Sequence, residues 1–109
     1  MQVIKIGDRR YLVDDQGFLK EFAHWEKEFA VHCGRKAKQR ISQLTDKHWD
    51  LIDGLRAYFL ESGRLPLVRH FCSEMQVKQR VLYELFPEGP YFGIAKIAGI
   101  PQQPIDPNH

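Results

Sequence analysis

The side chains best suited to covalent chemistry are two cysteines, Cys33 and Cys72. A thiolate attacks sulfur and carbonyl centres, and it forms readily only beside a base or a positive charge. Both cysteines fall on the apolar side of an expected helix, where a thiol usually serves as an inert small hydrophobe. We therefore expect both thiols to react slowly, and a sulfur-carrying role for either one stays as an alternative.

The five histidines are scattered at positions 24, 32, 48, 70 and 109. His32 adjoins Cys33 and His70 lies two residues before Cys72, but the spacings typical of zinc ligands, Cys-x-x-Cys and His-x-x-x-His, do not occur. A glycine-rich phosphate loop of the usual spacing is also missing. The sequence therefore predicts neither a metal site nor a cofactor.

Basic residues suggest a second kind of chemistry, the binding of nucleic acid. Residues 46–75 are expected to form a helix, a glycine-containing turn and a second helix, a pattern used by DNA-reading proteins. The candidate nucleic-acid contacts are Arg64, Arg69, His70 and Lys78, with Glu74, Gln79 and Arg80 close by. The same pattern is ordinary in small helical domains, and the formal net charge is only +2. A DNA-binding regulator is therefore an alternative and not the favoured function.

A shorter basic run, RKAKQR, occupies residues 35–40. Such a run can bind an acidic partner or RNA, but it is more often a solvated connector between helices. We interpret it as a connector.

Two β-rich runs in residues 2–13 must form the first element. Ile4 and Ile6 alternate with a lysine and so share one face of a strand. Gly7-Asp8 separates this run from a second one, residues 11–13, which predicts a hairpin. A hairpin alone is marginal in water, so we expect it to pack against helices.

Helical periodicity follows from residue 20 onward. The first helix is expected over residues 20–33, ending at Gly34, and the second after an N-cap at Thr45. Ser62-Gly63-Arg64 ends the second helix, Pro66 is expected in the first turn of a third, and residues 76–86 complete the set. The predicted buried faces comprise Phe22, Trp25, Phe29 and Cys33, then Trp49, Ile52, Leu55, Phe59 and Leu60, and then Leu67, Val68, Phe71, Cys72 and Met75.

The end of the chain changes character at Pro87, which stops a helix. A short apolar run, residues 91–97, follows a turn, and Gly99 is expected to cap it. Beyond it, Pro101, Pro104 and Pro107 predict an extended, mobile arm. The chain thus divides into a hairpin (1–15), a helical bundle (20–100) and an arm (101–109) within one domain, residues 1–109.

The totals fit this α+β fold, a small N-terminal β-hairpin on about five helices. The 109 residues are enough for one core, and 43% hydrophobic with 28% charged content is typical of a globular protein. We expect no secretory leader and no membrane span, since no apolar run approaches about 18 residues. Two distant cysteines fit a reducing cytoplasm.

Several stretches resemble one known family. They are GFLKEFAHWEKEFA (17–30), LTDKHWDLIDGLRAYFLESGRLPLVR (44–69), LFPEGP (85–90) and AKIAGIP (95–101). Together they resemble the DsrC/TusE family, which includes the gamma subunit of dissimilatory sulfite reductase and a sulfur-relay protein. The resemblance implies a fold with a flexible C-terminal arm, on which a cysteine near the chain end carries sulfur. In DsrC-type members it implies a second cysteine just before the Lys-Ile-Ala-Gly motif.

Those two family positions hold Ala95 and, on an ungapped count, Asp106 in this sequence. The resemblance therefore predicts the family's docking surface without its sulfur chemistry, as in a non-catalytic or regulatory paralogue that acts by protein binding. The expected partners are sulfite reductase-like proteins or sulfur-relay donor and acceptor complexes. The candidate partner-binding residues are Arg80, Tyr91, Lys96, Ile97, Gly99, Pro101 and Asp106.

Overall fold

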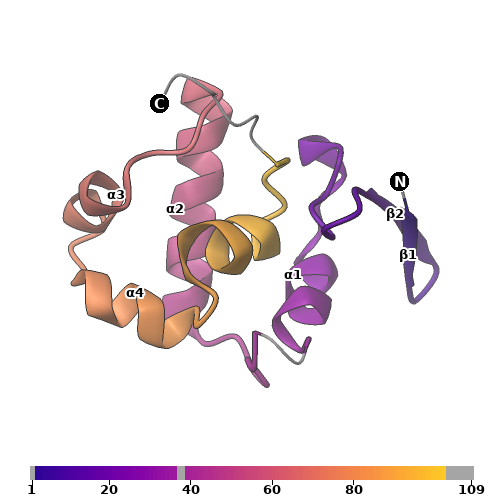
Figure 1. The fold of residues 1–109 in the computed structure, drawn as a ribbon, viewed down its shortest axis with the longest axis horizontal. Helices are drawn as coiled ribbons and strands as arrows, with labels where there is room; N and C mark the ends of the chain where they lie inside the picture. The colour runs from indigo at the N-terminus through magenta and orange to yellow at the C-terminus, as the bar shows by residue number, and fades with distance from the viewer. Residues whose placement is uncertain (1, 37–38, 103–109) are drawn as a thin grey trace.

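The computed structural model describes residues 2–36 and 39–102, and it contains a β-hairpin followed by helices (Figure 1). The elements are β1 (Gln2–Ile6), β2 (Arg9–Val13), the 3-10 turn η1 (Phe22–His24), α1 (Lys27–Gly34), α2 (Asp46–Ser62), α3 (Val68–Glu74), α4 (Gln79–Leu85) and the π-helical segment η2 (Pro90–Ala95). Helix α2 is the longest, with α3 and α4 on one side of it and α1 and the hairpin on the other. The α+β prediction is confirmed.

The hairpin has the predicted two-residue loop, and Gly7 in that loop has a φ of +58°. Ile4 pairs with Tyr11 across the ladder, and both point to the core together with Ile6 and Val13. Tyr11 and Val13 are almost completely buried. The alternation seen in the sequence therefore sets which face of the hairpin packs on the helices.

The first helix begins later than predicted. Residues 22–24 form the short turn η1, and α1 starts only at Lys27. Trp25 and Glu26 between them are extended, with ψ of 139° and 159°. Trp25 leaves the helical path because its indole N–H donates to the Ile97 carbonyl oxygen, a contact between distant parts of the chain.

Helix α2 begins after Thr45, as predicted, but His48 completes the cap. The Thr45 N–H donates to His48 Nδ1 at 3.0 Å, so the imidazole takes the place of the glutamate found in many capping boxes. The opposite nitrogen, Nε2, donates to the Leu85 carbonyl oxygen at 2.9 Å. One buried side chain thereby joins the start of α2 to the end of α4.

Two leucines predicted to be buried are exposed. Leu60 is 75% exposed because it lies nine residues after Leu51, which places it on the opposite face of α2 from that buried side chain. Leu67 is 76% exposed because it is the N-cap of α3, so Pro66 precedes the helix and does not lie in its first turn. Gln76, with a φ of +56°, separates α3 from α4, which therefore starts at Gln79 and not at 76.

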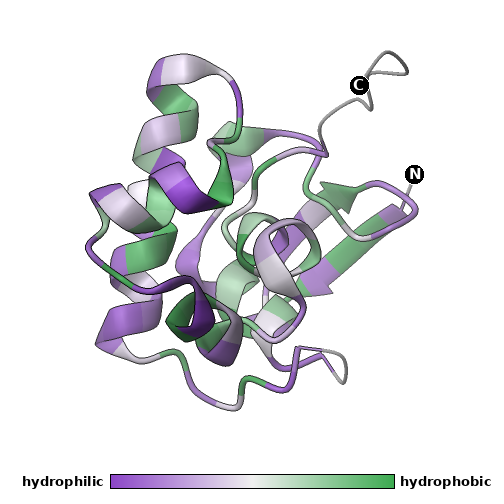
Figure 2. Ribbon diagram, turned by 60° about the vertical axis from the view of Figure 1, so that its left-hand side comes forward, coloured by the Kyte–Doolittle hydropathy of each residue, from purple (hydrophilic) through white to green (hydrophobic). Residues whose placement is uncertain are grey.

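The core joins hairpin, helices and C-terminal segment. Its largest fully buried side chains include Tyr11, Phe29, Leu51, Phe86 and Ile97. Hydrophobic and hydrophilic positions alternate along the helices and strands (Figure 2). Among the described residues, none of the helices combines the length and apolar character needed to cross a bilayer.

Candidate functional site: the anchored C-terminal segment

The apolar run near the end of the chain, residues 90–100, forms what we call the anchor segment. It contains η2 and one further turn, and it lies against α2 (Figure 1). Its inward side chains are almost fully buried, namely Ile94, Ala95, Ile97, Ala98 and Ile100. The last turn closes with a bond from the Ile100 N–H to the Ala95 carbonyl oxygen at 3.0 Å. The segment is therefore part of the core.

Two side chains clamp the carbonyl groups of this last turn. Trp25 Nε1 donates to the Ile97 oxygen at 2.9 Å, and Arg56 Nη1 donates to the Ala98 oxygen at 2.7 Å. Arg56 also donates to the Phe22 oxygen at 3.3 Å. Its guanidinium lies 3.9 Å from the centre of the Phe22 ring and 4.2 Å from that of Trp25. Burial lowers the pKa of Arg56, and these contacts compensate the buried charge with ring faces and carbonyl dipoles.

Gly99 lies directly against the Trp25 indole. Its φ is +73°, the left-handed conformation expected of a C-cap glycine. A Cβ atom at this position would lie 2.3 Å from Cδ1 of Trp25. Glycine is therefore required twice, for the backbone conformation and for the close approach of the indole.

The other side of the anchor segment contacts the loop after β2. Lys96 is half-buried, and its ammonium lies 5.6 Å from the centre of the Phe18 ring. The Phe18 ring packs edge-on against Phe92 at 5.5 Å, and Gln39 Nε2 donates to the Phe92 carbonyl oxygen. Further along, Gln102 donates to Gln16 at 3.0 Å.

The structure brings most of the predicted docking residues onto one segment. Ile97 and Gly99 are buried within it, Lys96 and Pro101 are half-buried, and Tyr91 is 57% exposed. Ala95 is 1% exposed. Arg80 is exposed on α4, and Asp106 lies outside the described residues.

Both cysteines occupy the buried positions that the periodicity predicts. Burial raises the pKa of Cys33 to about 11, an effect that the charges of Lys96 and Lys36 reduce only in part. Burial also raises the pKa of Cys72. At neutral pH both sulfurs therefore remain thiols, shielded from solvent and poorly suited to sulfur exchange.

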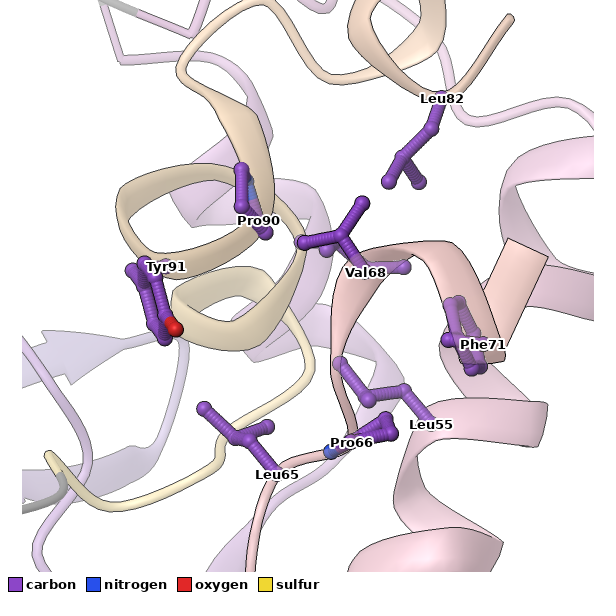
Figure 3. Close-up of a pocket in the computed structure, with 9 residues that line it drawn as sticks. Leu55, Leu65, Pro66, Val68, Phe71, Leu82, Pro90 and Tyr91 are labelled. Carbon is purple, nitrogen blue, oxygen red and sulfur yellow. The ribbon is translucent and has the colours of Figure 1, made fainter. Parts of the chain in front are cut away.

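A small apolar cleft separates the anchor segment from the start of α3 (Figure 3). Pro90 and Tyr91 form one wall, and Leu65, Pro66 and Val68 form the other. Its volume is about 20 Å³, which is room for roughly one water molecule. The cleft is therefore too small to hold a metabolite.

The four candidate nucleic-acid contacts, Arg64, Arg69, His70 and Lys78, are all exposed on or beside α3. His70 Nε2 lies 3.1 Å from a carboxylate oxygen of Glu74. That carboxylate brings negative charge to the helix face that would have to approach a phosphate backbone. In residues 2–36 and 39–102, His, Cys, Asp and Glu side chains do not gather in groups of three that could hold a metal.

Three important side chains were not identified from the sequence. Arg56 gave a signal, since it lies one turn after Ile52 on the apolar face of α2, where a lone charge needs a partner. Trp25 was assigned to the core without regard to its indole donor, which also needs an acceptor. His48 gave no signal, because its bond to Leu85 spans 37 residues.

Comparison with known proteins identifies one family that matches almost the whole chain. The profile of the family described as DsrC like protein matches residues 5–105. The gamma subunit of dissimilatory-type sulfite reductase from Nitratidesulfovibrio vulgaris is 35% identical over 94% of this chain and 95% of its own length. Sulfurtransferase TusE from Photorhabdus laumondii is 35% identical over 82% of this chain and 84% of its own length.

Solved structures share the fold. The chain described as dissimilatory sulfite reductase I (DsrI) superposes with a TM-score of 0.89 at 30% identity, covering 96% of this chain and 99% of that one. The oxidized gamma subunit, DsrC, from Archaeoglobus fulgidus gives 0.85 at 29% identity, with the same coverage. With its hairpin, helices and anchor segment, the chain belongs to the DsrC/TusE family of sulfur-relay proteins.

Proposed function

We propose that this chain is a non-catalytic, regulatory member of its family that acts by binding proteins of sulfur metabolism. The observation that carries the proposal is the placement of its thiols. Cys33 and Cys72 are the only cysteines in the sequence, and both are buried with raised pKa values. A relay protein passes sulfur as a persulfide, which requires an accessible thiolate.

The anchor segment supports the binding part of the proposal. The hydrogen bonds from Trp25 and Arg56 fix the last turn of this segment against the rest of the protein. Tyr91 offers an exposed aromatic side chain next to it, of the kind enriched at protein interfaces. The chain would thus keep a surface for a partner while residues 95 and 106 bring no thiol to it.

The names of the relatives suggest the class of partner. One is a subunit of dissimilatory-type sulfite reductase and another is a sulfurtransferase. We accordingly propose a sulfite reductase-like protein or a sulfur-relay donor or acceptor complex as the partner, in the cytoplasm, where both thiols would stay reduced.

A competition experiment tests this function. Biolayer interferometry would measure binding of the chain to a dissimilatory sulfite reductase stripped of its gamma subunit and to a sulfur-relay complex stripped of TusE. We expect saturable binding to one of them, competition by the cysteine-bearing relative, and at least about tenfold weaker binding for the Tyr91→Ala/Lys96→Glu variant. Arg69→Ala is the matched surface control and should bind normally.

Failure to bind either complex would contradict the proposal. So would tight, site-specific binding of DNA at physiological salt that is lost in Arg69→Ala, because it would favour the regulator of transcription instead.

A further inference from the structure

The hairpin has one edge that is paired and one that is not. On the far side of β2, Leu19 bridges to Val13 and the Lys20 N–H donates to the Leu12 oxygen at 2.9 Å. Strand β1 has β2 as its neighbour, and the described part of the chain supplies no other strand or backbone hydrogen bond to its outer edge. The hairpin lies at the periphery of the molecule, next to α1 (Figure 1). An edge of this kind can template the addition of another strand.

The outer face of the hairpin is apolar at one pair and positive at the next. Val3 pairs with Leu12, and these side chains are 60% and 37% exposed. Lys5 pairs with Arg10, and both are exposed. Like charges directly opposite each other in a ladder repel. A neighbouring carboxylate on this face would relieve that repulsion, while an apolar side chain would cover the other pair.

The inner side of the same edge opens into a groove between β1 and α1. The groove is about 420 Å³ and is lined by Ile6, Glu28, Val31, His32, Arg35 and Lys36. Glu28, its one carboxylate, already accepts a hydrogen bond from the Tyr11 hydroxyl at 2.6 Å. His32 Nε2 is buried and finds no partner among the described residues. The polar lining is therefore predominantly positive and includes a ring nitrogen that is not yet paired.

We propose that β1 is a docking edge for an extended, acidic segment of a partner protein, which would add to the hairpin as a third strand. Backbone groups along β1 would hold the segment, and its side chains would alternate between the outer face and the groove. Both sides are positive, with Lys5 and Arg10 on one and Arg35 and Lys36 on the other. Acidic residues in the segment are complementary on both sides.

A second copy of this chain fits the edge poorly. Pairing of β1 with β1 would bring two Lys5 side chains and two sets of groove cations together.

The docking edge shares no residue with the anchor segment, so this proposal and the proposed function can fail separately.

The probe for the test is a fluorescein-labelled twelve-residue peptide, Glu-Glu-Val-Val repeated three times, which places carboxylates and apolar side chains on both faces of a strand. It is titrated into the full chain and followed by anisotropy and by amide chemical shifts. We expect saturable binding that weakens with salt, with the shifts concentrated in residues 2–6 and 28–36. A peptide of the same sequence in which L and D residues alternate cannot place its side chains on two faces of a strand. It should bind at least about tenfold more weakly.

Charge reversal on the protein gives the matched comparison. Lys5→Glu/Lys36→Glu should weaken binding by about tenfold or more, since two attractive contacts become repulsive. Lys47→Glu/Lys78→Glu changes the net charge equally at two exposed lysines away from the edge, and it should leave the affinity within about twofold. Unchanged amide spectra outside the substituted sites would show that each variant folds.

Several results would overturn the docking edge. These are equal weakening in the two double variants, equal binding of the heterochiral peptide, and chemical shifts centred elsewhere. If sedimentation showed that the chain dimerises through β1 in the absence of peptide, the occupant of the docking edge would be a second copy of the chain. Tighter binding of a single-stranded RNA 20-mer than of the peptide, with shifts at the same residues, would make the surface a nucleic-acid site.

Discussion

At the scale of single residues, two polar side chains, the buried His48 and the half-buried Arg56, connect distant parts of the chain. Arg56 joins α2 to η1 and to the anchor segment, and His48 joins the start of α2 to the end of α4. Each forms hydrogen bonds with partly buried backbone groups. Both therefore make specific predictions about stability.

Replacement of Arg56 by alanine should lower the free energy of unfolding by about 2–4 kcal/mol. The change removes the stacked guanidinium and leaves the carbonyl oxygens of Ala98 and Phe22 without their donors. Urea unfolding followed by circular dichroism measures the change. Arg64→Ala, at an exposed arginine, is the control and should stay within about 0.5 kcal/mol of the wild type. Similar losses of stability in both variants would show that the contacts of Arg56 with Ala98 and Phe22 do not stabilise the fold.

His48 should make the protein less stable in mild acid. Burial lowers the pKa of His48 below the ordinary value of 6.5, and the hydrogen bond to the Leu85 carbonyl oxygen opposes this shift only in part. The unfolded chain therefore binds a proton first, and stability falls as the pH drops below 6.5, by at most about 1.4 kcal/mol per pH unit for this group. His32, whose pKa is also lowered, acts in the same direction.

Urea midpoints at pH 7.5 and pH 5.5 for the wild type and His48→Gln measure the share of His48. The variant should be less stable at pH 7.5, because the cap and the bond to Leu85 are lost, and it should depend less on pH. An unchanged pH dependence in the variant would assign the effect to other groups.

At the scale of elements, the ends of helices decide how the anchor segment sits. Gly99 and Gly63 have nearly the same φ, +73° and +74°, but a Cβ at Gly99 would meet Trp25 whereas one at Gly63 meets nothing within 4 Å. Substitution by alanine therefore tests backbone strain alone at Gly63, and backbone strain together with steric overlap with Trp25 at Gly99.

Gly63→Ala should cost about 1–2 kcal/mol, the strain of a left-handed residue that has a Cβ. Gly99→Ala should cost at least about 1–3 kcal/mol more, because the indole must move and loses its bond to Ile97. Thermal unfolding gives both values, and the tryptophan fluorescence, to which Trp25 and Trp49 both contribute, should change only in Gly99→Ala. Equal losses of stability in the two variants would mean that the Trp25 side chain moves away from the new methyl group at no cost in free energy.

Much of this arrangement could be predicted from local sequence. Alternation of Ile4 and Ile6 set the face of the hairpin, and Thr45 and Gly63 marked the two ends of α2. The break at Trp25 and Glu26 could not be predicted, because its cause is a bond to a residue 72 positions away. The cap by His48 and the clamp by Arg56 depend on long-range contacts of the same kind.

At the scale of the whole molecule, the fold and the chemistry separate. The hairpin, helices and anchor segment superpose on gamma subunits of sulfite reductase, and the anchor segment has the glycine and the clamp that its path requires. Ala95 and Asp106 have no thiol, so neither residue can form a persulfide. Our account is that the body of the protein still binds while its chain end carries no sulfur.

Sulfur loading measured by intact mass spectrometry tests this account most directly. The wild type, Asp106→Cys, Gln103→Cys and Asn108→Cys would each be incubated with a persulfidated rhodanese-type donor. The account predicts no added sulfur on the wild type and gain of one sulfur atom by Asp106→Cys, with less loading of the cysteines at 103 and 108. A stable persulfide on Cys33 or Cys72 of the wild type would contradict it, since the chain would then carry sulfur without a cysteine at the family positions.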